Sequence, residues 1–158
     1  PPPTDCRDVC PMSMLELYQE VILDHNKSPR NFRDMDCASH KACGKNPLCG
    51  DELDLFLNIE DGVIQDVSFT GTGCAISVAS ASLLTEKLKG RTVTDAEAIY
   101  REVHMMLTGE SDVDPAELGK LAVLSGVCQF PVRVKCASLA WHTMHAALQD
   151  RSEDVSTE

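Results

Sequence analysis

Three of the eight cysteines lie where a thiol can do chemistry, because each stands at the end of a predicted structural element. Cys49 precedes a predicted strand, Cys74 follows the next strand, and Cys136 lies near the start of the last predicted helix. Asp51, two residues after Cys49, adds a carboxylate. Thiolates combined with one carboxylate suit a tetrahedral zinc ion or an iron–sulfur cluster. The residue types therefore indicate a candidate metal site.

A β-hairpin is the element that must bring two of these positions together. Leucines alternate with polar residues over 52–59, which predicts a strand with one buried face, and a second strand is predicted over 63–70. We predict a three-residue loop, Glu60-Asp61-Gly62, with Gly62 in the left-handed conformation, because this loop keeps both apolar faces on one side of the sheet.

The predicted register has a consequence for the cysteines. It pairs Leu55 with Val67, and pairing continued to the open end of the hairpin sets Asp51 opposite Gly71 and brings Cys49 level with Gly73 and Cys74. Residues 25 apart in sequence would then meet. The hairpin thus unites three of the four candidate ligands.

The rest of the chain is predicted to be mainly helical, from capping boxes, periodic apolar residues and glycine or proline boundaries. Five helices are expected, over residues 13–27, 75–89, 94–109, 114–126 and 131–149. The predicted fold class is α+β: a small antiparallel sheet, with a possible third strand beside the hairpin, packed against about five helices.

The chain length of 158 residues and an apolar content of 43% predict a single globular domain. We expect this domain to span residues 13–149. Residues 1–12, with three prolines, are expected to form a disordered leader, and the acidic residues 150–158 a disordered tail.

Helix position also affects the chemistry of the thiols. Cys74 is predicted at a helix N-terminus and Cys136 in the first two turns of its helix, where free N–H groups and the helix dipole favour a thiolate. Arg133 and Lys135 flank Cys136 and offer positive charge against a cluster of anionic ligands.

Composition excludes several classes of function. The formal net charge of −11 disfavours nucleic acids and anionic membranes as partners, and an aromatic content of 4% disfavours base-stacking surfaces. We expect no secretory signal, because no basic region followed by an apolar stretch opens the chain. Reduced thiols in the cytoplasm are therefore favoured over disulfides.

Simpler interpretations exist for each residue taken alone. A buried cysteine is often only a small hydrophobic residue, and an aspartate after a glycine often forms a turn. His25, at the end of the first helix, is expected to interact with the helix C-terminus rather than with a metal. No role in the site is predicted for the other cysteines: Cys6, Cys10, Cys37, Cys43 and Cys128.

Three ordered motifs resemble the iron–sulfur cluster assembly scaffold family, of the IscU and NifU N-terminal type. They are Asn46-Pro47-Leu48-Cys49-Gly50-Asp51, Gly71-Thr72-Gly73-Cys74-Ala75-Ile76-Ser77 and Arg133-Val134-Lys135-Cys136-Ala137. The general scaffolds that the chain resembles have a histidine directly before the last cysteine, and this chain has Lys135 at that position. Together with an extra segment at about Arg91 to Val113, this lysine makes the chain most similar to the SufU-like branch.

This resemblance implies a set of roles. It implies a zinc ion held by Cys49, Asp51, Cys74 and Cys136, and docking to a SufS-like cysteine desulfurase that delivers persulfide sulfur. Cys49 would be the sulfur acceptor, and Arg133 would be a basic residue near the site. The protein would act as a sulfurtransferase-like carrier together with the desulfurase rather than as an enzyme alone.

Two alternatives remain open at this point. One is a scaffold that assembles a [2Fe–2S] cluster on the same ligands and transfers it to cluster-accepting proteins. The other is a structural zinc-binding domain with only an interaction role. Lys135 in place of a histidine ligand favours the zinc-bound acceptor over the cluster scaffold.

Overall fold

The computed structural model describes residues 10–36, 38–47, 49–108, 121, 124, 131–149 and 155–156, with the backbone alone at 10–18, 131 and 155–156. The elements follow in the order α1 (Cys10–Lys27), β1 (His40–Asn46), β2 (Asp51–Glu60), β3 (Val63–Thr72), α2 (Ala75–Leu88), α3 (Val93–Thr108), α5 (Pro131–Leu148) and β4 (Val155–Ser156).

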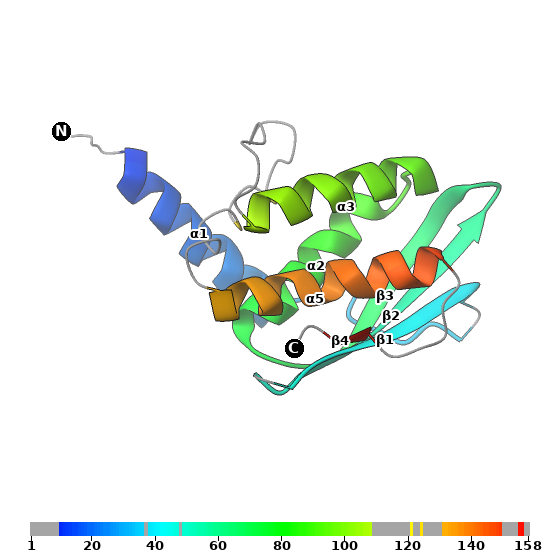
Figure 1. Cartoon of the computed structure of the whole chain (residues 1–158), viewed down its shortest axis with the longest axis horizontal. Helices are drawn as coiled ribbons and strands as arrows, with labels where there is room; N and C mark the ends of the chain where they lie inside the picture. Colours follow the sequence, from blue (N-terminus) through cyan, green and yellow to red (C-terminus); the bar gives the residue numbers. More distant parts are fainter. Residues whose placement is uncertain are drawn as a thin grey trace.

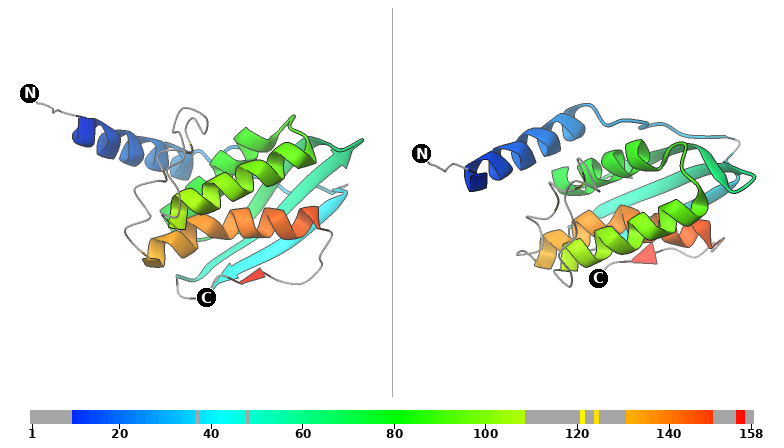
Figure 2. Two further views of the ribbon diagram at one scale, coloured as in Figure 1. Left: turned by 45° about the horizontal axis from the view of Figure 1, so that its top comes forward. Right: turned by 90° about the horizontal axis from the view of Figure 1, so that it is seen from above.

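The helices cover one face of a four-stranded sheet whose order is β3-β2-β1-β4 (Figure 1). Helices α2 and α5 pack directly on the sheet, α3 lies over α5, and α1 packs against α2 (Figure 2). This is the predicted α+β fold, with four helices among the described residues rather than about five. None of the described helices is long and apolar enough to cross a bilayer.

The hydrophobic core lies between the sheet and the helices, as the alternation in β2 predicts. Leu53, Leu55 and Leu57 face the helices and are buried. The opposite face of β2 also carries one buried side chain, Phe56, with the ammonium group of Lys41 5.2 Å from its ring centroid.

The hairpin forms as predicted, but its predicted register is wrong by two residues. Leu55 pairs with Phe69, and Val67 pairs instead with Leu57. Asp61 and Gly62 both have positive φ, so the loop is a tight two-residue turn. A β-bulge between the pairs Asn58↔Asp66 and Ile59↔Ile64 then restores the inward apolar face. An extra residue is needed to keep both apolar faces on one side of the sheet, as predicted, but it lies in β3 rather than in the loop.

A third strand, β1, lies in the segment that the sequence pattern leaves irregular. It pairs with β2 in antiparallel orientation and packs against α5. Gly44 makes this close packing possible, because a Cβ there would lie 2.1 Å from Oγ1 of Thr143 and 3.1 Å from Leu139. The strand is stabilised by tertiary contacts rather than by local β-propensity.

The sheet also has an edge strand that the sequence does not predict. Val155 and Ser156 form β4 within the predicted disordered tail, and they pair in parallel with Gly44 and Lys45 of β1. Backbone hydrogen bonds are enough for such a short strand, so its low apolar content gave no signal. The other residues of the predicted tail, and residues 1–9 of the predicted leader, lie outside the described part of the chain.

The helix boundaries agree with the sequence at α2 and α5 and differ at two N-termini. Helix α1 begins at Cys10, three residues before the predicted cap at Ser13. Helix α3 is capped by Thr92 rather than Thr94, since Thr92 Oγ1 accepts a hydrogen bond from the Asp95 N–H at 3.1 Å. The predicted helix at 114–126 lies almost wholly outside the described residues.

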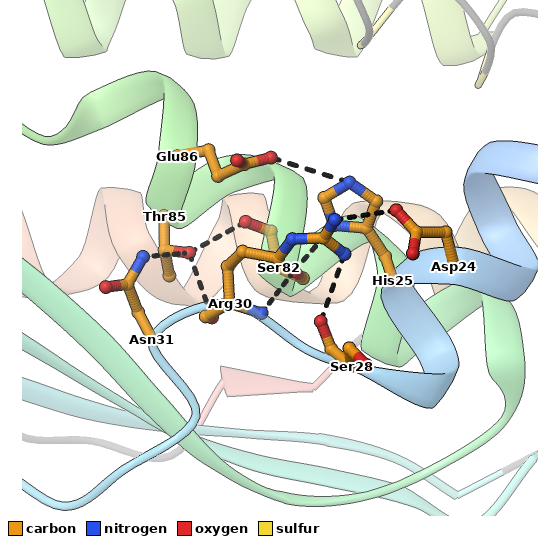
Figure 3. A network of polar contacts seen from close by, with 8 residues as sticks. All are labelled: Asp24, His25, Ser28, Arg30, Asn31, Ser82, Thr85 and Glu86. Carbon is orange, nitrogen blue, oxygen red and sulfur yellow. Dashed lines mark hydrogen bonds and ion pairs between the residues drawn. The ribbon is translucent and has the colours of Figure 1, made fainter.

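A buried polar network joins the end of α1 to α2 (Figure 3). The Ser82 hydroxyl lies 2.7 Å from Nδ1 of His25 and accepts a hydrogen bond of 2.8 Å from the Arg30 N–H. Nε2 of His25 lies 3.4 Å from a carboxylate oxygen of Glu86. The side chain of His25 therefore contacts the neighbouring helix α2, which explains why a histidine is buried at this position.

Aromatic side chains join α3 to α5. The ring of Tyr100 stacks on that of His145 with centroids 4.4 Å apart, and the Tyr100 hydroxyl lies 2.9 Å from Nδ1 of His142. The ring of His104 lies 5.6 Å from that of His142. Burial lowers the pKa of His142, and the neighbouring His104 and His145 lower it further.

We predict that Ser82→Ala destabilises the fold by about 1–3 kcal/mol, because it removes the hydrogen bonds that the Ser82 hydroxyl makes with the Arg30 N–H and the His25 ring in a buried site. The matched control is Ser68→Ala. The Ser68 hydroxyl is also buried but finds no hydrogen-bond partner among the described residues, so its loss is neutral or stabilising. Urea unfolding of both variants measures the difference, and equal effects would contradict this account.

We predict that His142 makes stability fall in mildly acidic solution. Because its folded pKa is lowered, the unfolded chain binds the proton first, and the free energy of unfolding decreases as the pH falls through about 6.5. The loss is complete below the folded pKa. Urea unfolding between pH 7.5 and 5.5 should show a shallower pH dependence for His142→Gln than for the unaltered protein. An unchanged slope would show that His142 is not responsible.

Candidate metal centre

Four separate elements deliver the four predicted ligands to one end of the sheet. Cys49 lies in the turn after β1, and Asp51 is the first residue of β2. Cys74 is the N-cap of α2, and Cys136 lies in the second turn of α5. Asp51 is 1% exposed and Cys136 is 0% exposed, whereas Cys49 and Cys74 are half-buried. The site is therefore closed on the side of the core and open on the side of the two half-buried cysteines.

The carboxylate of Asp51 links the hairpin to α2. Its Oδ1 accepts a hydrogen bond of 2.8 Å from the backbone N–H of Cys74. Gly73 allows this approach, because a Cβ at that position would lie 2.8 Å from the same oxygen. The second oxygen, Oδ2, accepts a hydrogen bond of 3.2 Å from Nδ2 of Asn46. Both oxygens are thus held in place by the protein.

The sulfur atoms complete the group. The Sγ atoms of Cys49 and Cys136 lie 3.1 Å apart, and these two sulfurs and a carboxylate oxygen of Asp51 all lie within 4.8 Å of one another. Cys74 stands slightly outside this group of three, with its Sγ 4.0 Å from Oδ2 of Asp51. As the N-cap, that Sγ accepts a hydrogen bond of 3.4 Å from the Ser77 N–H. The structure therefore brings all four predicted ligands together, three of them closely.

The α2–α5 interface holds the two helix-borne cysteines in register. The Ser80 hydroxyl donates to the carbonyl of Ala137, next to Cys136, at 2.6 Å. The same hydroxyl accepts a hydrogen bond of 3.1 Å from Nε1 of Trp141. All these residues are buried, so the distance between the start of α2 and the second turn of α5 is set by a fully satisfied contact.

The electrostatics of the metal-free site disfavour a thiolate at Cys136. Burial raises the pKa of the Cys136 thiol well above its usual range, and Cys49, Asp51 and Cys74 raise it further by hydrogen bonding. The predicted preference of Cys136 for a thiolate is therefore not seen in the metal-free chain. This residue lies beyond the free N–H groups of the first turn, and burial outweighs the helix dipole. A bound divalent cation would reverse the balance.

The donor set fits zinc. Structural zinc sites use tetrahedral thiolate and carboxylate ligands, and zinc–sulfur bonds of about 2.3 Å place two sulfurs about 3.7 Å apart. The Sγ atoms of Cys49 and Cys136, 3.1 Å apart, would need to separate by less than 1 Å to reach that value. Cys49, Asp51, Cys74 and Cys136 would hold the ion.

Other predicted residues lie around this centre. Arg133 is exposed and stands three residues before Cys136 on α5, and Lys135 is half-buried. The part of Arg133 in the chemistry remains a prediction. Cys43 lies in β1 between two inward-facing residues, so its side chain is on the opposite face of the sheet. There it lines a cavity of about 370 Å³. Of the remaining cysteines, Cys6, Cys37 and Cys128 lie outside the described residues, and only the backbone of Cys10 is described.

Asn46 and Ser77 contact the ligands but are not singled out by the sequence pattern. An asparagine before a proline is read first as a turn former, and a serine in a first helical turn contributes here only its backbone N–H. The sequence does offer one indication for Asn46, because this residue lies within the same six-residue motif as Cys49 and Asp51.

The antiparallel strands β1, β2 and β3, with helices on one face and a cysteine-rich candidate metal centre at one end, define a small α+β domain. The chain belongs to the NifU-like N-terminal domain family, whose model matches residues 17–137. The family resemblance seen in the motifs is thereby confirmed.

Individual relatives extend the comparison. The chain is 41% identical over 133 residues to the iron–sulfur cluster assembly scaffold protein IscU of Thermotoga maritima, covering 84% of this chain and 93% of the relative. It is 38% identical over 128 residues to the zinc-dependent sulfurtransferase SufU of Bacillus subtilis, covering 81% and 86%. The crystal structure of a NifU-like protein from Brucella abortus has a TM-score of 0.78 at 18% identity, covering 87% and 96%, and shows the shared fold.

We predict that the purified chain binds one zinc ion and that Gly73→Ala weakens this binding by about tenfold, because the added methyl group displaces the Asp51 carboxylate. The φ of Gly73 lies outside the left-handed region, so alanine is not excluded by the backbone itself. Thr72→Ala, at the neighbouring exposed position, should keep the full affinity. Competition with a chromophoric chelator measures all three proteins. Equal affinities would show that Asp51 is not a ligand.

Proposed function

We propose that this protein accepts persulfide sulfur from a cysteine desulfurase and carries it toward iron–sulfur cluster assembly, with Cys49 as the acceptor. The observation that carries the proposal is the convergence of Cys49, Asp51 and Cys136 within 4.8 Å, with Cys74 beside them. It is supported by the similarity to a protein named as a zinc-dependent sulfurtransferase.

The geometry separates the roles of the cysteines. Cys136 is fully buried on a helix and Cys74 caps a helix, so both are held by secondary structure. Cys49 lies in the turn between β1 and β2 and is half-buried, so it can reach an approaching partner with the least rearrangement. Zinc, when bound, would keep these thiols deprotonated at neutral pH.

The transfer is a thiolate–persulfide exchange. The Cys49 thiolate attacks the terminal sulfur of the desulfurase persulfide, a new S–S bond forms at Cys49, and the old S–S bond breaks. The desulfurase cysteine leaves as a thiolate, so no external oxidant or reductant is needed. Arg133, exposed one helical turn before Cys136, would offer positive charge to the anionic groups that meet in this step.

The partner follows from this chemistry. A SufS-like desulfurase is the donor that we propose, and proteins that accept finished clusters are the later partners. The protein would act only together with the desulfurase rather than as a separate enzyme. The transfer requires reduced cysteines, and the four cysteines described outside α1 form no disulfide, which suits the reducing cytoplasm.

A second candidate function is the assembly of a [2Fe–2S] cluster on the same ligands. The 41% identical relative from Thermotoga maritima is named as a scaffold, which favours it. Three thiolates and a carboxylate can also ligate iron. Against it, position 135 holds a half-buried lysine, which cannot serve as a ligand while protonated. A colourless protein containing zinc supports the first function, and a coloured one with iron and sulfide the second.

We predict that Cys49→Ala abolishes the stimulation of a SufS-like desulfurase, returning sulfide release from cysteine to the rate of the desulfurase alone. Cys43→Ala is the matched control, because Cys43 lies on the opposite face of the sheet and should leave the stimulation intact. Sulfide release is measured with a thiol reductant present. Full stimulation by Cys49→Ala would reject Cys49 as the acceptor, and no stimulation by the unaltered protein would favour a scaffold or structural role.

A further inference from the structure

We propose that Asn46 is the positioning residue of the metal centre: its side-chain amide holds Asp51 and Cys136 as fixed ligands and leaves Cys49 as the ligand that gives way. The inference deepens the proposed function and rests on it for the meaning of Cys49 release. The placement of Asn46 itself rests only on the geometry of the site.

Asn46 contacts three of the four ligand residues. It is the last residue of β1 and is 0% exposed. Its Nδ2 donates to Oδ2 of Asp51 at 3.2 Å and to Sγ of Cys136 at 3.5 Å. Its backbone carbonyl accepts a hydrogen bond of 3.3 Å from the Cys49 N–H. One residue therefore joins the acceptor turn, the carboxylate ligand and the helix-borne thiol.

The chemistry of the neighbours determines which way the amide points. Both side-chain partners of Asn46 are anionic when they bind a metal, and both accept hydrogen bonds. The two N–H groups of Nδ2 match these two acceptors. A reversed amide would direct Oδ1 at the Asp51 carboxylate and at sulfur, so the orientation with Nδ2 toward the ligands is the favourable one.

The other end of the same amide shows that the position is specialised. Oδ1 of Asn46 is buried and has no hydrogen-bond partner among the described residues. A buried unpaired carbonyl costs free energy, so an asparagine selected only for stability would not be expected here. The two donor contacts to the ligands offer the reason for placing a polar residue at this buried point.

The N–H donors differ among the three sulfurs. Cys136 receives a hydrogen bond from Asn46, and Cys74 receives one from the Ser77 N–H. In the part of the chain that the structure describes, the sulfur of Cys49 receives no N–H donor. Hydrogen bonds to a ligating sulfur withdraw electron density from it and tune the site. Cys49 is thus the one of the three sulfurs without an N–H donor among the described residues, and it lies in a turn rather than on a helix or at a helix cap.

The decisive substitution is Asn46→Leu, which keeps the branching of the side chain at Cγ, adds some volume and removes both donors. We expect the affinity for zinc, measured by chelator competition, to fall by about 10-fold or more. In the protein loaded with Co²⁺, the sulfur-to-cobalt charge-transfer band should move to lower energy, because the sulfur of Cys136 loses its hydrogen bond. The free energy of unfolding of the metal-free protein should stay equal or rise, because the unpaired Oδ1 is removed as well.

A third measurement resolves the cysteines. In the zinc-loaded protein, alkylation followed by mass spectrometry should modify Cys49 first, and Asn46→Leu should lower the ratio of Cys49 to Cys136 modification. Asn58→Leu, on the outer part of β2, is the matched control and should leave affinity, spectrum and ratio unchanged. Asn46→Ser, which keeps one small donor, should give intermediate values and replaces the leucine variant if that variant fails to fold.

The outcomes separate the two proposals. Unchanged affinity, spectrum and alkylation ratio in a folded Asn46 variant would overturn the role of Asn46. A loss of stability with no change in these three readouts would show a purely structural residue and would overturn it equally. Altered readouts in a protein that never stimulates a desulfurase would uphold Asn46 as the positioning residue and reject the proposed function instead.

Discussion

The hydrogen bond from the backbone N–H of Cys74 to the Asp51 carboxylate is the interaction on which the centre depends. It closes the open end of the β2–β3 hairpin and places Cys74 at the start of α2. It also orients the carboxylate so that its second oxygen faces the sulfurs. The glycine before Cys74 leaves the necessary space. A single backbone contact thereby relates the sheet, the first covering helix and the ligand set.

The centre combines two opposed electrostatic demands. Its ligands are anionic in the metal-bound form, and the chain as a whole carries a formal charge of −11, yet Asp51 and Cys136 are fully buried. Without a cation, burial holds the Cys136 thiol in its neutral form. Ligand geometry is therefore built into the fold, whereas ligand charge depends on the ion.

Much of this arrangement could be predicted from local patterns. Local preferences explain these successes. Alternating leucines favour the half-buried strand β2, a glycine favours the end of α2, and a proline favours the start of α5. The hairpin register could not be predicted, because it depends on a bulge whose position has no local signal. Strand β1 forms through contacts with α5, and the role of Asn46 appears only when Cys136, 90 residues away, lies beside it.

Gly44 links the interior of this protein to its chemistry. Strand β1 approaches α5 so closely at Gly44 that the Thr143 hydroxyl occupies the place of a side chain, and two residues further along the same strand Asn46 meets Cys136. Because both contacts lie on one strand and face one helix, a change in the packing of β1 on α5 would also alter the contact between Asn46 and Cys136.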